Sequence, residues 1–168
     1  MTPGRGDLVV TQWAARFGGR RFPVAIGRGG MTDDKREGDG ATPRGVWRLM
    51  HGGYRADRLA PPAAPVRLRP IGPRALWSDD PEAPEYNQPV RAPYGPSHER
   101  LARGDRLYDV FLVTDWNWPR AVPGAGSAIF VHHWRKPRHP TAGCLAFRPD
   151  HLAWILARWT ARSRIFVR

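Results

Sequence analysis

The chain has 168 residues, of which 41% are hydrophobic, a size and composition typical of one folded domain and not of a disordered chain. Its one cysteine excludes an internal disulfide and a multi-cysteine zinc knuckle. The formal net charge of +12 comes almost entirely from arginines, which are scattered singly and in pairs. We therefore expect no nucleic-acid partner. An anionic substrate or polymer and a compositional bias of the genome both remain as explanations of the charge.

The beginning of the chain lacks the features of an export signal. Residues 8–10 form the only early apolar run, far shorter than the hydrophobic region of a secretory signal. No stretch approaches the roughly 18 apolar residues of a membrane-spanning helix. We expect a protein without a transmembrane segment that works in the cytoplasm, unless an export segment precedes Met1.

Short strands separated by turns are expected in the first half of the chain. Glycine and proline number 18 each, which indicates many turns. Strands are expected at 8–15 and 21–27, joined into a hairpin through the turn FGGR. Three more are expected at 45–53, 65–71 and 74–78. The Pro-rich segment 79–98 is expected to be a long connection, of the kind that often forms a lid or a binding wall.

The second half contains the strongest predicted strands and the one predicted helix. Residues 105–116 and 126–134 are rich in β-branched and aromatic residues, which favour strands. Residues 149–161 predict a helix, because apolar residues recur at helical spacing along them. A last strand is expected at 164–168. The predicted fold is mostly β, a sandwich or closed sheet with one C-terminal helix packed on it.

The single cysteine, Cys144, lies in HPTAGCLAF, after a glycine and before an apolar run. Such a thiol is either a buried filler or a nucleophile, and a nucleophile needs a nearby base or positive field to form its thiolate. Four of the six histidines lie between residues 132 and 151, around the cysteine. Gly143 leaves room for a substrate carbonyl. The backbone N–H groups of Gly143 and Cys144 suit a developing oxyanion.

His132 and His133 are neighbours on a predicted strand, so their side chains point to opposite faces and only one can readily face the thiol. A backbone carbonyl of the pair can accept from the second ring nitrogen and orient the base. A zinc site is an alternative role for these histidines. Its candidate ligands lack the paired spacing typical of zinc sites, so we expect no metal; they are His132, His139, Cys144 and His151.

Five segments of the chain carry a family resemblance. They are KREGDGATPRGVWRL (35–49), WSDDPEAPEYNQPV (77–90), LYDVFLVTDWN (107–117), GSAIFVHHW (126–134) and PTAGCLAF (140–147). In this order they resemble the YkuD-type L,D-transpeptidase catalytic domain. The resemblance extends over nearly the whole chain and implies a single domain at 1–168 with a β-sandwich-like fold.

The resemblance implies a cysteine acyltransferase without a metal or organic cofactor. By position in the motif, Cys144 is the nucleophile, His132 is its base, and the backbone carbonyl of His133 orients that base. Thr141 and Gly143 occupy the Ser/Thr and Gly positions before the cysteine. Family members attack the bond between the L-centre of a diamino acid and the following D-residue of a peptidoglycan stem peptide. Stem peptides or muropeptides are therefore the expected partners, and the cell envelope is the expected location.

The sequence departs from the commonest family motif near the cysteine. Ala142 replaces the histidine of Ser-His-Gly-Cys, and Ala146 stands where an arginine usually follows. The base also precedes the nucleophile by only 12 residues (144 − 132). These changes indicate a divergent branch and leave the substrate carboxylates to other guanidinium groups. The candidate substrate-binding residues, besides Thr141, are Arg135, Arg148, Trp134 and Asn117.

Two other matching segments are expected to support the site. In EGDGATPRG, dense in turn-forming residues, we expect Lys35 to pair with Glu37 or Asp39. In the long connection, Tyr86 and Asn87 are expected to form a lid.

Three functions remain open from the sequence. An amine acceptor would make the chain a transpeptidase, whereas water would make it an L,D-carboxypeptidase that trims tetrapeptides, for instance during recycling in the cytoplasm. The third is a non-catalytic basic module that binds nucleic acid or wall polymer. It predicts that Cys144→Ala leaves the activity intact and that salt abolishes it.

Overall fold

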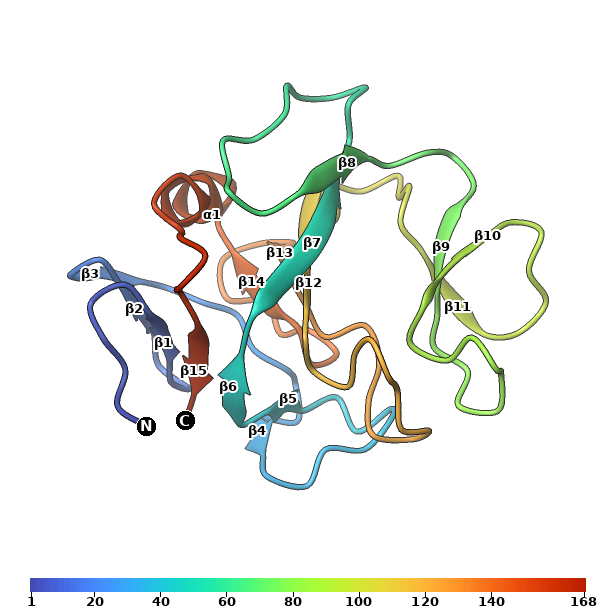
Figure 1. Cartoon of the computed structure of the whole chain (residues 1–168), viewed down its shortest axis with the longest axis horizontal. Coiled ribbons are helices and arrows are strands. Elements are labelled where there is room, and N and C mark those ends of the chain that lie inside the picture. Colours follow the sequence, from blue (N-terminus) through green and yellow to red (C-terminus); the bar gives the residue numbers. More distant parts are fainter.

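The computed structural model describes residues 1–168 and confirms a mostly β chain with one helix (Figure 1). The first five-stranded sheet has the order β3-β2-β1-β15-β6. Its strands are β3 (Arg20–Phe22), β2 (Ala15–Phe17), β1 (Leu8–Val10), β15 (Ile165–Val167) and β6 (Gly45–Trp47). Strand β15 is parallel to β1 and antiparallel to β6, so the last strand of the chain lies inside the sheet.

The second five-stranded sheet carries the residues of the candidate site. Its order is β14-β13-β12-β7-β8. The strands are β14 (Leu145–Phe147), β13 (Phe130–His133), β12 (Val110–Thr114), β7 (Leu49–Tyr54) and β8 (Leu68–Pro70). Every residue of β12 is buried, as expected for a continuous apolar run in the centre of a sheet covered on both faces.

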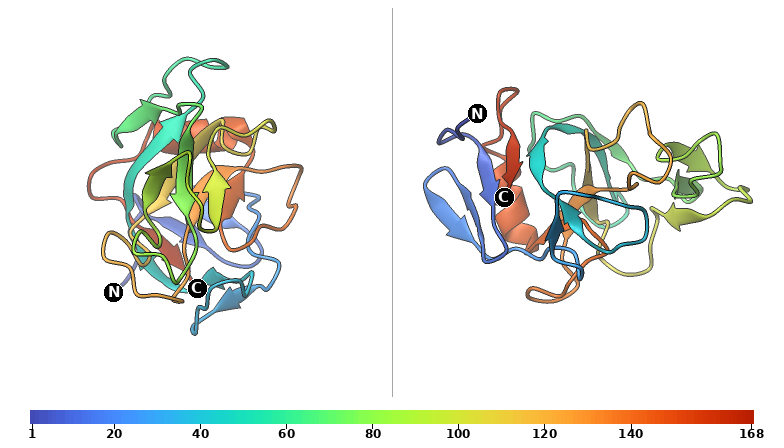
Figure 2. Two further views of the ribbon diagram at one scale, coloured as in Figure 1. Left: turned by 90° about the vertical axis from the view of Figure 1, so that its right-hand side faces the viewer. Right: turned by 90° about the horizontal axis from the view of Figure 1, so that it is seen from below.

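The remaining strands form two smaller sheets. One joins β10 (Pro89–Arg91), β9 (Ala75–Ser78) and β11 (His98–Arg100), and lies at the opposite end of the molecule from β1 to β3 (Figure 2). The other pairs β4 (Met31–Thr32) with β5 (Thr42–Pro43). The prediction of a strand-free connection at 79–98 is therefore wrong for residues 89–91 and for its last residue. These residues form strands because they pair with β9 on its two sides.

Two of the predicted strands are interrupted by local chemistry. The predicted strand 8–15 turns back on itself, because the Thr11 hydroxyl accepts from the backbone N–H of Ala14 and shapes a turn between β1 and β2. The predicted strand 45–53 is divided at Arg48, where the chain passes from the first sheet to the second. In the predicted strand 21–27, β3 ends at Phe22, immediately before a proline that has no N–H to donate.

The hydrophobic core has two parts. A cluster of 20 buried residues fills the space between the two large sheets and helix α1 (Pro149–Leu156). A second cluster of eight, which includes Cys144, lies on the other face of the second sheet, toward β9. The thiol therefore belongs to the smaller cluster, beside the small sheet.

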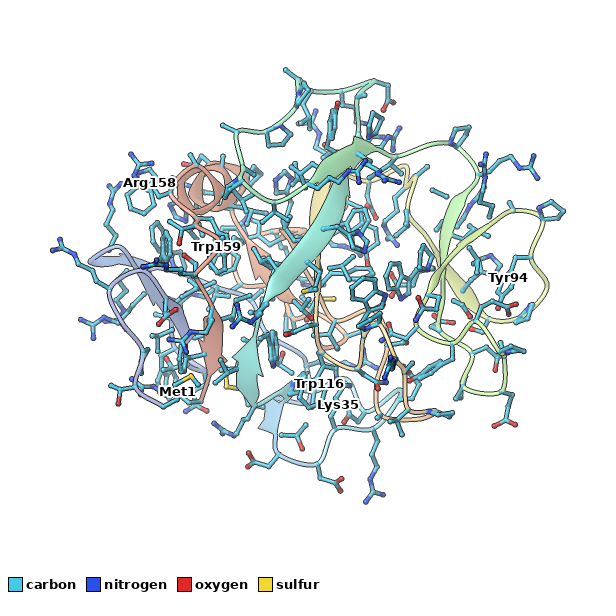
Figure 3. The ribbon with its side chains drawn as sticks, in the orientation of Figure 1. Met1, Lys35, Tyr94, Trp116, Arg158 and Trp159 are labelled. Atoms are coloured by element: carbon cyan, nitrogen blue, oxygen red, sulfur yellow. The ribbon has the colours of Figure 1, made fainter.

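The helix is shorter than the predicted 149–161. It buries Leu152, Ile155 and Leu156 and ends at Leu156. The Ser163 hydroxyl accepts from the backbone N–H of Thr160, a local contact that competes with continued helix. Trp159, labelled in Figure 3, stacks on Phe17 with ring centroids 5.5 Å apart. No helix in the structure is long and apolar enough to cross a membrane.

Candidate active site

A cavity of about 780 Å³ opens beside the second sheet and contains most of the predicted site. Its lining comes from β11, the loop before β12, the end of β13 and the segment before β14. The predicted site residues that line it are His132, Trp134, Arg135, Thr141 and Cys144. Residues predicted from the sequence to carry catalysis and binding therefore come together at one concave surface.

The pairing of β13 with β14 brings the candidate base to the candidate nucleophile. The two strands are parallel, with Val131 beside Leu145 and His132 beside Ala146. Side chains in register on adjacent strands point to the same face, and so do residues two apart on one strand. Cys144 directly precedes β14, and it lines the same cavity as His132 and Ala146, so the side chains of His132 and Cys144 lie on one face. The alternate residues Val131 and Leu145 point to the larger core on the other face.

The ring of His132 is held in one tautomer. Its Nδ1 lies 2.7 Å from the carbonyl oxygen of His133, which can only accept, so Nδ1 carries the proton. Nε2 is left with a free lone pair, the form that a general base requires. Burial lowers the pKa of His132 to about 4, so the imidazole is neutral at pH 7. The orienting contact predicted for the His133 carbonyl is present in the structure.

The thiol of Cys144 is buried and protonated at rest. Its Sγ donates to the carbonyl oxygen of Ala128 at 3.1 Å, and the N–H of Phe130 donates to Sγ at 3.4 Å. Burial raises the pKa of Cys144 to about 12, and the negative charge of Glu99 adds to the effect. A thiol with such a pKa needs a base at the moment of attack, since almost no thiolate exists at pH 7.

Gly143 is required by its backbone and its surroundings. Its φ of +140° lies in a region that favours glycine, and an added Cβ would stand 2.8 Å from the carbonyl oxygen of Ala41. Its N–H donates to the Thr141 hydroxyl at 3.1 Å, so it is already engaged. Of the two N–H groups predicted for the oxyanion, only that of Cys144 makes no hydrogen bond within the chain.

Thr42 holds the peptide group that precedes the thiol. The side chain is fully buried; its hydroxyl donates to the carbonyl oxygen of Gly143 at 2.8 Å and accepts from the N–H of Gly27 at 2.8 Å. In a trans peptide the carbonyl and the next N–H point in opposite directions. By fixing the Gly143 carbonyl, Thr42 therefore fixes the direction of the Cys144 N–H.

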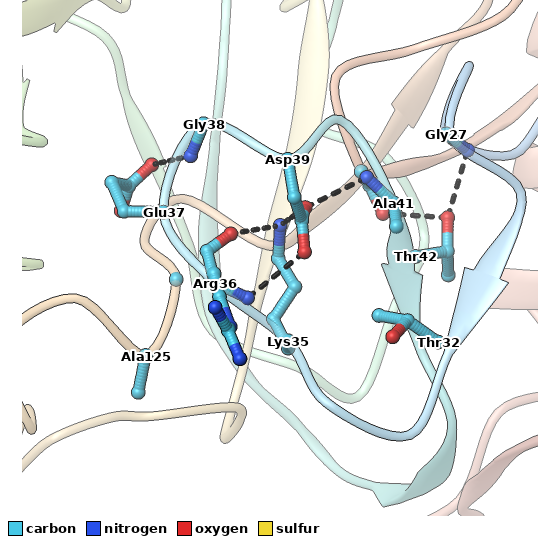
Figure 4. Close-up of polar contacts among 12 residues, drawn as sticks. Gly27, Thr32, Lys35, Arg36, Glu37, Gly38, Asp39, Ala41, Thr42 and Ala125 are labelled. Carbon is cyan, nitrogen blue, oxygen red and sulfur yellow. Dashed lines mark hydrogen bonds and ion pairs between the residues drawn. The ribbon is translucent and has the colours of Figure 1, made fainter.

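An ion pair supports the turn that presents Thr42. Asp39 pairs with the buried Lys35 and accepts from the N–H groups of Arg36 at 2.9 Å and Ala41 at 2.8 Å (Figure 4). The predicted pairing of Lys35 is thus made with Asp39. Glu37 instead accepts from the Tyr86 hydroxyl at 2.5 Å.

Tyr86 and Asn87 do not form the predicted lid. Both are buried, and neither lines the cavity. The Asn87 carboxamide oxygen accepts from the indole N–H of Trp77 and the backbone N–H of Ala128, each at 2.9 Å. Asn87 therefore anchors the segment that carries the carbonyl group bonded to the thiol, and its role is structural.

Two predicted substrate-binding residues lie outside the cavity. The Asn117 carboxamide is used within its own loop, where it donates to the carbonyls of Val122 and Gly126. Arg148 pairs with Asp150 at 2.5 Å beside the start of α1. Both side chains are bonded to partners in their own loop or helix, and neither lines the cavity.

The alternative zinc ligands are not brought together. His139 lines the cavity, whereas His151 packs against the ring of Phe22, with centroids 5.2 Å apart. Because His151 belongs to α1, it lies on the side of the second sheet opposite to Cys144.

The sequence reasoning missed several residues of the cavity, including two that contact each other. Tyr108 and Glu99 line it together, and the Tyr108 hydroxyl donates to the Glu99 carboxylate. The ring of Tyr108 stands edge-on to His132, with centroids 5.2 Å apart. Tyr108 lies within the matching segment LYDVFLVTDWN, but Glu99 lies in a short edge strand without any local signal.

Comparisons with known proteins identify the family of the chain. Residues 12–167 match the YkuD family, the L,D-transpeptidase catalytic domain. Among solved structures, an L,D-transpeptidase from Mycobacterium smegmatis is similar, with 13% sequence identity and a TM-score of 0.42. This match covers 96% of the present chain and 58% of the other, so the chain spans less than two thirds of that protein. No curated protein matches the chain. Because the family match includes nearly every residue described above, the chain belongs to the YkuD family of L,D-transpeptidase catalytic domains.

Proposed function

We propose that the chain is a cysteine L,D-transpeptidase that acts on peptidoglycan stem peptides. The observation that carries the proposal is that a neutral, oriented His132 and the Cys144 thiol line one cavity. Family membership supplies the reaction class and the peptidoglycan substrate. The catalytic roles of His132 and Cys144 are part of the proposal, and their places in the cavity and in the family motif support them.

The first half of the reaction forms a thioester. As Sγ of Cys144 attacks the carbonyl carbon of the L-diamino acid, Nε2 of His132 takes the thiol proton. The N–H of Cys144 donates to the oxyanion that forms. When the C–N bond breaks, His132 returns the proton to the amine of the departing D-alanine.

The second half releases the acyl group. An amine attacks the thioester carbonyl, His132 takes its proton, and Cys144 leaves and is reprotonated. The product is a new peptide bond and the free enzyme. If water attacks in place of the amine, the product is a tripeptide, and the chain is an L,D-carboxypeptidase.

The charge of the cavity suits a substrate with carboxylates. Four arginines line it: Arg28, Arg100, Arg103 and Arg135. Ala146, at the position of the usual family arginine, lines the cavity beside His132 and carries no charge. Guanidinium groups from other segments therefore replace it, since they bind carboxylates with paired hydrogen bonds.

Mass spectrometry of a disaccharide-tetrapeptide ending in D-alanine tests the proposal. With an added D-amino acid or a second muropeptide, wild type is expected to give exchanged or joined products, and Cys144→Ala none. His132→Gln is expected to lose at least about 100-fold in turnover, whereas His151→Gln, outside the cavity, is the matched control and stays near wild type.

Each alternative predicts a different product pattern. Tripeptide as the only product would assign the carboxypeptidase activity. A protein without turnover whose binding to wall polymer persists in Cys144→Ala and is lost at high salt would be a binding module and not an enzyme.

A further inference from the structure

Glu99 is a charged side chain in the cavity without a charged partner. One carboxylate oxygen accepts from the Tyr108 hydroxyl. No lysine or arginine nitrogen lies within 4.0 Å of the carboxylate, although four arginines line the same cavity. The adjacent Arg103 is already engaged, since it pairs with Asp105 at 2.7 Å and stacks over the Tyr108 ring. The chain thus leaves this carboxylate open to a ligand.

The position of Glu99 relates it directly to the reacting groups. Tyr108 is buried, donates to Glu99 at one end and stands edge-on to the His132 ring at 5.2 Å. Glu99 also acts electrostatically on Cys144, whose pKa it raises. The carboxylate therefore lies about one side-chain length from the pair that attacks the substrate.

Two other carboxylates act on Glu99 although the cavity as a whole is rich in arginine. Burial raises the pKa of Glu99 and the charges of Asp79 and Glu37 add to the effect, whereas the Tyr108 hydroxyl and Arg103 lower it. One carboxylate oxygen of Asp79 is itself buried without a hydrogen-bond partner. A cation bound at this position would relieve both the burial cost and the repulsion among the carboxylates.

We propose that Glu99, held by Tyr108, binds the side-chain ammonium group of the diamino acid whose carbonyl Cys144 attacks. The inference rests on the proposed function, which supplies a substrate with such a group. A diamino acid carries its free amine at the end of a side chain, several bonds from the reacting carbonyl. Tyr108 reaches from Glu99 to the ring of His132, so the carboxylate lies apart from the reacting groups, as that arrangement requires.

The carboxylate suits the acyl donor and not the acceptor. A carboxylate stabilises an amine in its charged form, and an ammonium group has no lone pair with which to attack the thioester. An acceptor amine bound at Glu99 would therefore be held in its unreactive state. The donor side chain needs only to be held, and its charge is retained throughout the reaction.

Two tetrapeptides that differ only at this amine test the inference. One carries the free side-chain amine, and the other carries it acetylated, which removes the charge. For wild type, we expect kcat/KM for release of D-alanine to fall by about tenfold to a hundredfold on acetylation, as for the loss of a hydrogen bond to a charged group. Glu99→Gln is expected to lose a similar factor on the free-amine peptide and little on the acetylated one. Glu82→Gln, an exposed carboxylate outside this cavity, is the matched control.

The outcomes separate this inference from the proposed function. Equal kcat/KM of wild type for both peptides overturns the role of Glu99 and leaves the proposed function intact. An equal loss on both peptides in Glu99→Gln, with a melting curve like that of wild type, assigns Glu99 to scaffolding and also overturns it. If folded wild type turns over neither peptide, the proposed function fails, and this inference fails with it.

Discussion

Replacing Thr42 by valine should separate the geometry of residues 141–144, the thiol loop, from the chemistry of the Cys144 thiol. The change keeps the shape of the side chain and removes the hydroxyl that bonds Gly143 and Gly27. Both lost partners are backbone groups in a fully buried site. Each stranded group costs about 1–3 kcal/mol, so we expect a loss of about 2–5 kcal/mol in the free energy of unfolding. For a domain of this size, the melting temperature should fall by about 5–15 °C.

The same substitution should affect the chemical step. Without Thr42 the Gly143 carbonyl is free to rotate, and the N–H of Cys144 loses its fixed direction toward the oxyanion. We expect kcat to fall by about tenfold to a hundredfold, with KM changed by less than about threefold. The assay is release of D-alanine from the tetrapeptide at a temperature where the variant is fully folded.

Two control variants make this test decisive. Thr42→Ser keeps the hydroxyl and should keep most of the activity. Thr32→Val removes a hydroxyl that only accepts from the exposed N–H of Asp34, and should change neither stability nor kcat. A folded Thr42→Val enzyme with wild-type kcat would refute the link between this hydroxyl and catalysis.

Three further predictions concern charge. Burial and Glu99 raise the pKa of Cys144 to about 12, so its rate of alkylation by iodoacetamide should be low at pH 7 and rise continuously with pH. Glu99→Gln should shift this pH profile to lower pH. A plateau of the wild-type rate below about pH 9 would contradict the prediction. Asp7 is buried but accepts hydrogen bonds from Arg164, which hold its pKa below 3.8; Asp7→Asn should cost about 2–4 kcal/mol of unfolding free energy at pH 7. Because the pKa of Asp7 is lower in the folded state than in the unfolded state, the difference in unfolding free energy between wild type and Asp7→Asn is complete above about pH 4. It disappears as the pH falls through the folded-state pKa of Asp7, which urea titrations at several pH values will measure. Arg148→Gln should change turnover by less than about twofold. A tenfold loss would show that Arg148 contributes to substrate binding after all.

The sequence reasoning succeeded where the signal was local. The order of the main strands follows from runs of β-branched and aromatic residues. The convergence of His132 and Cys144 on one face follows from two adjacent strands with side chains that alternate in direction. The position of the helix follows from apolar spacing, although side chains beyond its end shorten it by five residues (161 − 156).

The sequence reasoning failed where contacts between distant segments determine the position of a side chain. Thr42 bonds a carbonyl 101 residues away, so its role in the thiol loop is invisible in the pattern around it. Glu99 enters the cavity because β11 pairs with β9 at the edge of a small sheet, a partnership that no periodicity indicates. Asn117 and Arg148 were assigned to substrate by sequence position, whereas their own neighbours bind both side chains.

The position of β15 inside the first sheet has a consequence for the synthesis of this protein. Its partners β1 and β6 leave the ribosome long before residues 165–167 exist. At about 5–20 residues per second, the roughly 120 residues between Trp47 and Ile165 take on the order of ten seconds to translate. Throughout that time the edges of β1 and β6 that pair with β15 have no partner and are exposed to other nascent chains. The first sheet is therefore completed only after translation of the thiol loop, and a chaperone that covers unpaired strands should raise the yield of folded protein.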